Sequence, residues 1–291
     1  MRVVFYTSAT TGAGRLVTGM SIGNALNRKG VSCTYTIVHS SDLGRLAEDF
    51  NTVWVPVETE EDLAPDAWRS SVLYKTLSKL KPDVLLVHHT WFMVHHFIRE
   101  LPGIKLYLSD QAFDGHFRIH LDTGELVFDP GQYGRVIAIE PFGSAIPMER
   151  VNPLVLRNRD EILPRSKALR RMGLDGTKPV ALYSLSGSPE YFDRLREKYA
   201  YLEKEGYDVV YTGTWREGGI FPAVDYFNAV DLIVCGAGYN QVWEANYFGK
   251  KALFEILDVL LERRGALALP DHRRSLVLGL CLRDCECRHK C

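Results

Sequence analysis

The sequence predicts an α/β protein with two parallel-sheet domains in tandem, and three observations lead to this prediction. Short apolar runs rich in strand-forming residues alternate with segments of helical periodicity, which is the pattern of βαβ units. The alternation begins twice, at the N-terminus and again after a proline-containing linker near residue 150. The 291 residues also exceed what one hydrophobic core usually serves. We therefore expect Rossmann-like domains at residues 1–150 and 151–256, the second one incomplete, with a cleft between them.

The first domain is predicted to be a series of strands separated by helices. In its first helical segment Leu16, Met20, Gly23 and Leu26 recur at three- and four-residue spacing, and Gly30 ends the helix. The predicted strands are residues 2–9, 31–38, 52–57, 83–87, 105–108 and 134–139; the predicted helices are residues 15–29, 66–80 and 92–100; and a hairpin covers residues 117–128.

The second domain repeats the pattern with fewer elements. Asp160 is the predicted cap of a helix that Gly173 closes. The predicted strands are residues 179–185, 207–212, 232–235 and 251–256, and the predicted helices are residues 160–172, 189–201, 225–229 and 240–247.

The last part of the chain, residues 257–291, has no helical or strand period and is rich in arginine, leucine and cysteine. We interpret it as an atypical tail of a chain that is truncated or read out of frame. Its four cysteines, which are Cys281, Cys285, Cys287 and Cys291, lack the C-x2-C pairs of ordinary structural zinc sites.

Charge and hydropathy exclude several classes of partner. The formal net charge is -1, and lysine and arginine are spread without a long basic run, so we expect no nucleic-acid partner. No apolar run approaches the roughly 18 residues of a membrane span. The first apolar run is too short for a signal peptide. We expect a cytoplasmic protein, and the sequence leaves peripheral contact with the inner face of the membrane open.

Residues 231–249 contain the pattern most typical of a ligand site. Residues 232–235 predict a buried parallel strand, and the glycine-containing segment 236–238 predicts a tight turn. Asn240 is the predicted cap of the helix that follows. Backbone N–H groups and the positive end of the helix dipole meet at this turn, so an anion is the expected ligand. Glu244, one turn into the helix, is placed to accept hydrogen bonds from sugar hydroxyls.

The segment 230–250 is similar to the donor-site signature of GT-B glycosyltransferases, in particular the MurG-like family 28 transferases that use UDP-N-acetylglucosamine and related donors. This resemblance implies that Glu244 contacts the ribose of the nucleotide and that residues 237–240 lie along the diphosphate. The donor-binding residues that it implies are Ser186, Gly187, Ser188, Gly236, Ala237, Gly238, Tyr239, Asn240, Gln241 and Glu244.

Three further segments extend the resemblance to about residues 1–256. Residues 186–188 resemble the family's G-G-S loop, Asn152-Pro153 resembles its linker turn, and the loop Gly12, Ala13, Gly14 and Arg15 stands where the family has its acceptor-side T-G-G-H loop. The resemblance implies transfer of a hexosyl or N-acetylhexosaminyl group from a nucleotide-diphosphate sugar, UDP-linked in this family, to a saccharide or lipid-linked acceptor. It implies no cofactor and no metal ion, and the chain has no Asp-x-Asp metal motif.

The catalytic base cannot be the family's loop histidine, because Arg15 takes its place. His89 and Asp110 follow predicted strands, at the carboxyl edge where open α/β sheets bind ligands. Either side chain could take the proton of an acceptor hydroxyl near neutral pH. Asp114 and His116 lie just beyond and are not ranked against them. The histidines at 88–96 suggest a metal site only weakly, since the sequence places no carboxylate or cysteine to complete it.

Two other functional readings stay open. A truncated homologue could bind a ligand or partner without catalysis, which the short second domain motivates. A Rossmann-type oxidoreductase is the other alternative, suggested by Gly12 and Gly14 after the first strand. However, Val17 occupies the third glycine position of G-x-G-x-x-G, and no acidic residue closes the second strand.

Overall fold

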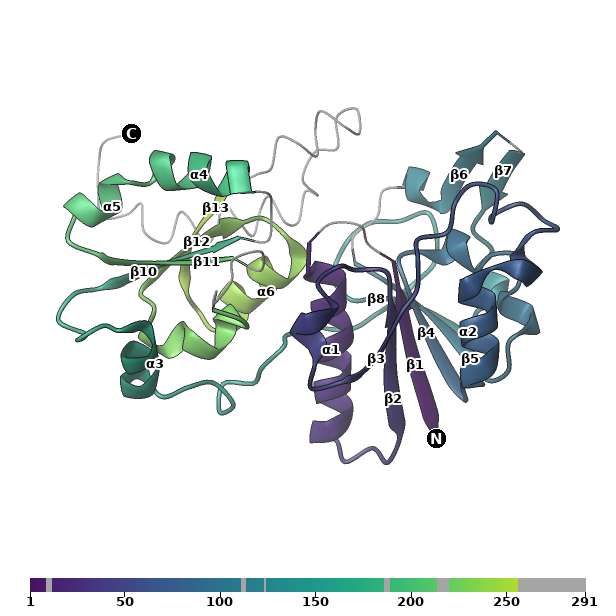
Figure 1. The fold of residues 1–291 in the computed structure, drawn as a ribbon, viewed down its shortest axis with the longest axis horizontal. Helices are drawn as coiled ribbons and strands as arrows, with labels where there is room; N and C mark the ends of the chain where they lie inside the picture. Colours follow the sequence, from purple (N-terminus) through teal and green to yellow (C-terminus); the bar gives the residue numbers. More distant parts are fainter. Residues whose placement is uncertain (9–11, 111–113, 123, 186–188, 214–219, 256–291) are drawn as a thin grey trace. The chain divides into compact units, whose positions relative to one another are not determined.

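The structure is a computed structural model that describes residues 1–8, 12–110, 114–122, 124–185, 189–213 and 220–255 (Figure 1). The tail at 257–291 and the loop at 186–188 therefore lie outside the described residues. The chain divides into two compact units, Met1–Leu154 and Val155–Cys291. The predicted cleft between the two domains stays a prediction.

Unit 1 contains a seven-stranded parallel sheet, as the alternating sequence pattern predicts. The strand order is β3-β2-β1-β4-β5-β8-β9, and each neighbouring pair is parallel. The strands are β1 (Arg2–Thr7), β2 (Thr34–His39), β3 (Asn51–Trp54), β4 (Val84–His88), β5 (Ile104–Ser109), β8 (Arg135–Ala138) and β9 (Glu149–Arg150). The predicted hairpin is confirmed as β6 (Arg118–Leu121) and β7 (Gly124–Val127), which form a separate two-stranded sheet.

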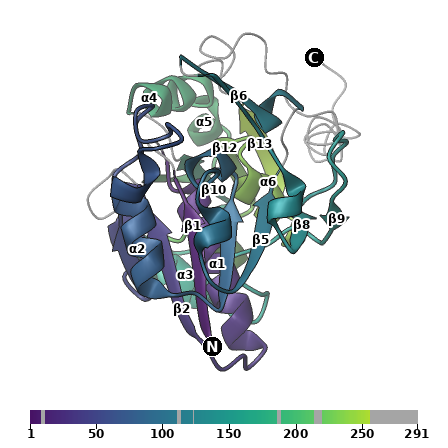
Figure 2. The same ribbon diagram turned by 90° about the vertical axis from the view of Figure 1, so that its right-hand side faces the viewer.

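Helices α1 (Gly14–Arg28) and α2 (Val72–Leu80) cover opposite faces of this sheet (Figure 2). Gly19 of α1 lies so close to Phe5 of β1 that a Cβ at Gly19 would be 2.8 Å from the ring. The next residue along the strand, Tyr6, points to the other face and joins the core cluster that contains Leu73 and Leu77 of α2. Alternate side chains of one central strand therefore anchor the two helical layers.

Two helix predictions in unit 1 are wrong in extent or type. The segment 66–80 is an α-helix only from Val72, because the Ser71 hydroxyl accepts from the Tyr74 N–H and caps it there. The segment 92–100 forms two 3-10 turns, η3 (Trp91–Met93) and η4 (Ile98–Glu100), in place of an α-helix. Aromatic, histidine and β-branched residues dominate this segment and favour α-helix poorly. The conformation of this segment is determined instead by the burial of Trp91 and its neighbours in the core.

Unit 2 contains a four-stranded parallel sheet in the order β11-β10-β12-β13. Its strands are β10 (Val180–Leu185), β11 (Asp208–Gly213), β12 (Leu232–Gly236) and β13 (Lys251–Glu255), and its helices are α3 (Arg165–Met172), α4 (Pro189–Lys198), α5 (Tyr201–Lys204), α6 (Tyr239–Tyr247) and the 3-10 segment η7 (Ala223–Ala229). Asp160 does not cap α3. Pro164 occupies the N-cap position, and the residue before a proline disfavours the α conformation.

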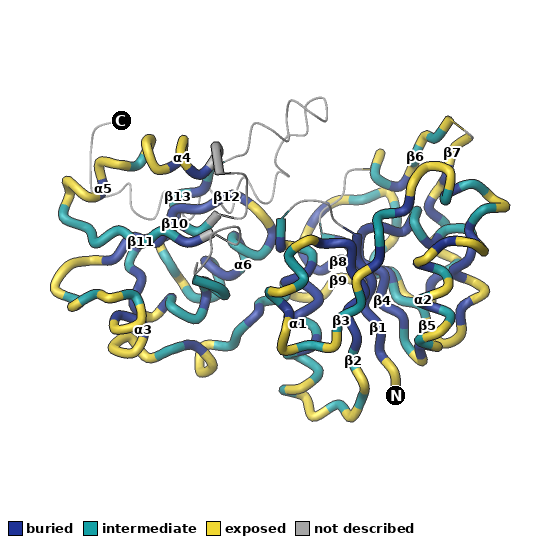
Figure 3. Tube along the Cα trace, in the orientation of Figure 1, coloured by how far each residue is buried: buried dark blue, intermediate teal, exposed yellow. Residues whose placement is uncertain are grey.

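In both units the central strands, such as β1, β4 and β12, are mostly buried, whereas the edge strand β9 and the outer faces of the helices are exposed (Figure 3). Within the described part of the chain, no helix has the length and apolar character needed to cross a membrane. Several buried polar side chains, among them Thr7, His39, His88 and Ser109, lie at the carboxyl ends of strands, and these edges hold the candidate sites.

Candidate functional site

The first candidate site lies at the carboxyl edge of the unit 1 sheet, where the strand order reverses. Strand β1 pairs with β2 on one side and with β4 on the other. In open α/β sheets such a reversal is the usual place for a ligand. Thr7 and His88 are opposite each other at the ends of β1 and β4. His89 follows β4 directly, and Asp110 follows the neighbouring strand β5, so both predicted catalytic residues reach this edge.

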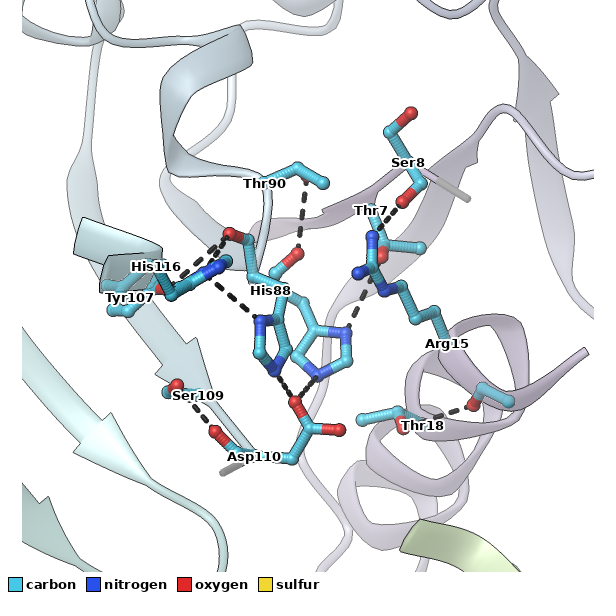
Figure 4. Close-up of polar contacts among 12 residues, drawn as sticks. Thr7, Ser8, Arg15, Thr18, His88, Thr90, Tyr107, Ser109, Asp110 and His116 are labelled. Atoms are coloured by element: carbon cyan, nitrogen blue, oxygen red, sulfur yellow. Dashed lines mark hydrogen bonds and ion pairs between the residues drawn. The ribbon is translucent and has the colours of Figure 1, made fainter. Parts of the chain in front are cut away.

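Two histidine side chains converge here on one carboxylate (Figure 4). Nε2 of His89 contacts Oδ1 of Asp110, and Nε2 of His88 lies 3.8 Å from the same oxygen. The exposed fractions of the side chains are 1% for His88, 10% for His89 and 21% for Asp110. Burial lowers the pKa of His88 to about 3 even though the Asp110 carboxylate opposes this effect. His88 is therefore a neutral imidazole, and Asp110 is the most accessible of the three groups.

The backbone at His89 has an unusual conformation. Its φ angle is 62°, in the left-handed region that residues other than glycine seldom adopt. The His89 N–H donates to the Leu108 carbonyl at 3.1 Å, and the Thr90 N–H donates to the His88 carbonyl at 2.7 Å. These bonds hold the chain in this conformation directly after β4. Strained backbone held by its surroundings is common at functional sites.

His116 is the second partner of His89 and comes from the 3-10 segment η5 (Asp114–Phe117). Nε2 of His116 lies 3.2 Å from Nδ1 of His89 and 3.0 Å from the His89 carbonyl oxygen. The Tyr107 hydroxyl lies 3.3 Å from the same nitrogen, and the Trp91 indole donates to the His116 carbonyl at 3.0 Å. Both ring nitrogens of His89 are thus engaged, one by Asp110 and one by His116.

The predicted acceptor-side loop ends at the same edge. Gly12 has a φ of 74°, and α1 begins at Gly14. The Arg15 guanidinium donates to the Ser8 carbonyl, and its charge acts on both His88 and Tyr107 (Figure 4). Ala13 is buried at the turn into the helix. The loop therefore supplies a fixed positive charge close to the His88 and Tyr107 side chains.

These three side chains also form the one group of potential metal ligands found in the described residues. One ligand atom from each of His88, His89 and Asp110 lies within 4.8 Å of the others. The sequence-based argument that no carboxylate completes the histidines is wrong, because Asp110 arrives from the neighbouring strand. How well the group suits a metal ion depends on which ring nitrogen of His89 carries the proton.

The second candidate site lies at the carboxyl edge of the unit 2 sheet, where the order reverses between β10 and β12. Strand β12 ends at Gly236, and α6 begins at Tyr239. The Ala237 N–H donates to the Glu255 carbonyl at 3.1 Å, and the Gln241 amide donates to the Ser184 carbonyl at 2.7 Å. These bonds tie the turn to the ends of β13 and β10.

The helix cap differs from the prediction. Gly238 is the N-cap, with an extended conformation at φ -71° that does not require glycine, and it makes no side-chain capping bond. Asn240 lies inside the first turn of α6, so its predicted role as the cap is wrong. The helix starts earlier because the chain leaves β12 through only two residues. The positive end of the α6 dipole still lies at 238–240, as the anion-site argument requires.

Glu244 is buried in the middle of α6, with 9% of its surface exposed. Burial raises the pKa of Glu244 to about 8, and the nearby Asp225 carboxylate adds to this, while a hydrogen bond from the Leu156 N–H and the charge of Arg157 oppose it. Nε of Arg157 pairs with Oδ1 of Asp225 at 2.8 Å. Glu244 is therefore a buried carboxyl group beside an ion pair rather than a surface charge.

The structure thus places most predicted residues at two sheet edges. The unit 1 edge brings together His89, Asp110 and the loop 12–15. The unit 2 edge brings together residues 236–241 and Glu244. Outside the described residues lie Ser186, Gly187 and Ser188. Sequence reasoning did not identify His116 as a partner of His89, nor Asp225 as a neighbour of Glu244. No spacing in the sequence indicates either contact, because both arise from packing between distant segments.

No protein-family model matches the chain, and no curated protein is significantly similar to it in sequence. Solved structures do match it. The spinosyn forosaminyltransferase SpnP has a TM-score of 0.59 and 14% identity, covering 97% of this chain and 90% of that one. The glycosyltransferase VinC in complex with dTDP has a TM-score of 0.57 and 14% identity, covering 97% of this chain and 91% of that one. MurG of Acinetobacter baumannii has a TM-score of 0.50 and 16% identity, covering 94% of this chain and 82% of that one. The predicted GT-B type of fold is confirmed by these likenesses.

Proposed function

We propose that this chain transfers a glycosyl group from a nucleotide-diphosphate sugar to a hydroxyl group of an acceptor. The observation that carries the proposal is the succession of strand β12, a short turn and helix α6, in which Glu244 is buried one turn into the helix. The positive helix end suits a diphosphate, and a carboxyl group at this position suits the hydroxyls of a ribose. The fold shared with SpnP, VinC and MurG supports the same function.

The unit 1 edge supports the chemical part of the proposal. Direct displacement at the anomeric carbon requires a group that takes the proton of the acceptor hydroxyl. The contact pair of His89 and Asp110 offers such a group at the reversal point of the sheet. The α6 N-terminus would stabilise the leaving diphosphate without a metal ion.

The resemblance of residues 230–250 supports a UDP-linked donor and a hexosyl or N-acetylhexosaminyl group. The dTDP bound by VinC makes dTDP-sugars the first alternative donors to test. A saccharide or lipid-linked acceptor fits the acceptor-side loop 12–15. A lipid-linked acceptor would bring the protein to the cytoplasmic face of a membrane.

A thermal-shift panel with UDP, dTDP, GDP, ADP and NAD tests the proposal. Stabilisation by a nucleoside diphosphate is the expected result, by about 2.7 kcal/mol when the ligand is at 100 times its Kd. Glu244→Ala should reduce the shift. The matched control Glu197→Ala, an exposed carboxylate of α4, should leave it unchanged. Stabilisation by NAD alone would favour an oxidoreductase, and no stabilisation by any nucleotide would refute donor binding.

A further inference from the structure

The contacts of His89 decide which of the two candidate bases takes the proton. We infer that Asp110 is the proton-accepting residue of the transfer and that His89 and His116 are positioning residues that orient its carboxylate. This inference rests on the proposed function, because it assigns roles within that reaction. It differs from the sequence-based expectation, which left His89 and Asp110 as equal alternatives.

The argument begins at Nε2 of His116. This nitrogen lies 3.0 Å from the carbonyl oxygen of His89, and a carbonyl oxygen can only accept a hydrogen bond. Nε2 of His116 must therefore carry a proton. The same nitrogen lies 3.2 Å from Nδ1 of His89, so Nδ1 faces a donor and carries no proton.

The position of the His89 proton follows. A neutral imidazole has one N–H, so the proton of His89 is on Nε2, which contacts Oδ1 of Asp110. A doubly protonated His89 would point an N–H at the N–H of His116, which is repulsive. His89 is thus a donor to Asp110 and has no nitrogen left with which to accept the proton of an acceptor hydroxyl.

Asp110 keeps the capacity to accept a proton. A carboxylate offers about four acceptor positions on its two oxygens. The imidazoles of His88 and His89 both approach Oδ1. The Asp110 side chain is also more exposed than either histidine, at 21% against 1% and 10%. Of the three groups it is the one that a hydroxyl group can approach.

The protonation state of His89 also bears on the metal question. A histidine binds a metal ion through a nitrogen that carries no proton. Nε2, the atom of His89 that lies within reach of Asp110 and His88, is the protonated nitrogen in this arrangement. The contacts with His116 thus favour a hydrogen-bonded carboxylate over a metal site.

The chemical step balances with these assignments. The acceptor oxygen forms a bond to the anomeric carbon of the donor, and the bond from that carbon to the diphosphate oxygen breaks. The diphosphate leaves with the electron pair of that bond. The hydroxyl proton moves to Asp110, while the Nε2–H of His89 holds the carboxylate in place throughout. Within the described part of the chain, the other charged or titratable groups around the His88, His89 and Asp110 cluster are His116, Tyr107 and Arg15.

The first test is NMR of the full chain with 15N-labelled histidine, and it needs no substrate. The signal that disappears in His89→Gln should report a neutral ring with its proton on Nε2 at pH 7.5. His116→Gln should preserve this state, because its amide can still donate, whereas His116→Ala should lose it. A proton on Nδ1 of His89, or a charged ring, overturns the inference and leaves the proposed function untouched.

The second test is UDP release from UDP-N-acetylglucosamine, with water as the acceptor. Asp110→Asn should lower kcat by roughly 10²- to 10⁴-fold. His89→Ala should lower it by roughly ten- to 150-fold with KM unchanged, as expected for the loss of one hydrogen bond to a charged group, and His89→Gln, whose amide can still donate, should lower it less. The acid limb of the pH profile should persist in His89→Gln.

Loss of that acid limb in His89→Gln, with the limb retained in Asp110→Asn, would make His89 the base and overturn the inference. Failure of the wild-type chain to bind any nucleoside diphosphate would refute the proposed function instead. The two failures are therefore distinguishable.

Discussion

The carboxyl edges of the two sheets carry different kinds of chemical group. The unit 1 edge gathers side chains that exchange or attract protons, with His89 in contact with both Asp110 and His116 and with Arg15 acting on the adjacent His88. The unit 2 edge presents backbone, a helix N-terminus and one buried carboxyl group, Glu244. Backbone dipoles suit the binding of a diphosphate, and ionisable side chains suit proton transfer. The comparison predicts that changes at one edge affect turnover and changes at the other affect nucleotide binding.

The largest effect is expected at the unit 1 edge. Asp110→Asn removes the proton acceptor while keeping the shape of the side chain, so turnover should fall by roughly 10²- to 10⁴-fold. The Kd for UDP should stay within about twofold of the wild-type value, measured by calorimetry, because this edge is not expected to touch the nucleotide. A large change in UDP affinity would break the comparison between the two edges.

A pH-dependent effect on stability is expected at the unit 2 edge. Below pH 4.5 Glu244 is protonated in both the folded and the unfolded chain. Between pH 4.5 and about 8 the unfolded chain has released this proton and the folded chain retains it, so the free energy of unfolding falls as the pH rises. Each unit of pKa difference corresponds to about 1.4 kcal/mol, so the full loss amounts to several kcal/mol.

Glu244→Gln should remove this dependence. Thermal unfolding of the wild type and the variant from pH 5 to pH 9 measures this dependence. The stability of the variant relative to that of the wild type should increase as the pH rises. Parallel curves would show that Glu244 is not a buried acid of raised pKa. An exposed carboxylate variant, Glu197→Gln, provides the matched control.

The effect of Glu244 on ligand binding comes next in size. Hydrogen bonds to a charged group contribute about 1.5–3 kcal/mol, so at pH 9, above the pKa of about 8 at which Glu244 ionises, Glu244→Ala should weaken UDP binding by roughly ten- to 150-fold. Fluorescence or calorimetric titration with UDP measures it. Wild-type affinity in the variant would contradict the ribose assignment, whereas an equal loss for UDP and for free diphosphate would place Glu244 on the diphosphate instead.

The smallest effect is expected from Gln241. Its amide donates to the Ser184 carbonyl at 2.7 Å and ties the first turn of α6 to the end of β10. Gln241→Ala should lower the free energy of unfolding by about 0.5–1.5 kcal/mol, measured by urea denaturation. Gln241→Glu, which keeps the size but cannot donate, should behave like the alanine variant. No change in either variant would show that the turn is held by its backbone bonds alone.

Much of the architecture could be predicted from the sequence because apolar runs and their spacing are local signals. Runs such as residues 83–87 and 232–235 become buried parallel strands wherever they occur in an alternating chain. The residues at which helices begin were harder to predict. Asp160 and Asn240 are both good capping residues by type, yet Pro164 and Gly238 occupy the caps. Where a helix begins depends on how the preceding strand or linker delivers the chain, and residue type does not report this.

The sequence by itself determined which side chains reach the ligand edges, because a residue that directly follows a parallel strand must lie at its carboxyl end. His89, Asp110 and the turn before Glu244 were identified in this way. Only the tertiary structure decided what these side chains do there. The contact of His89 with His116, 27 residues away, sets its proton on the side of Asp110. Burial turns Glu244 from a surface carboxylate into a buried acid with a pKa of about 8. Hydrogen-bond partners and desolvation are properties of the packed state, so no local pattern encodes them.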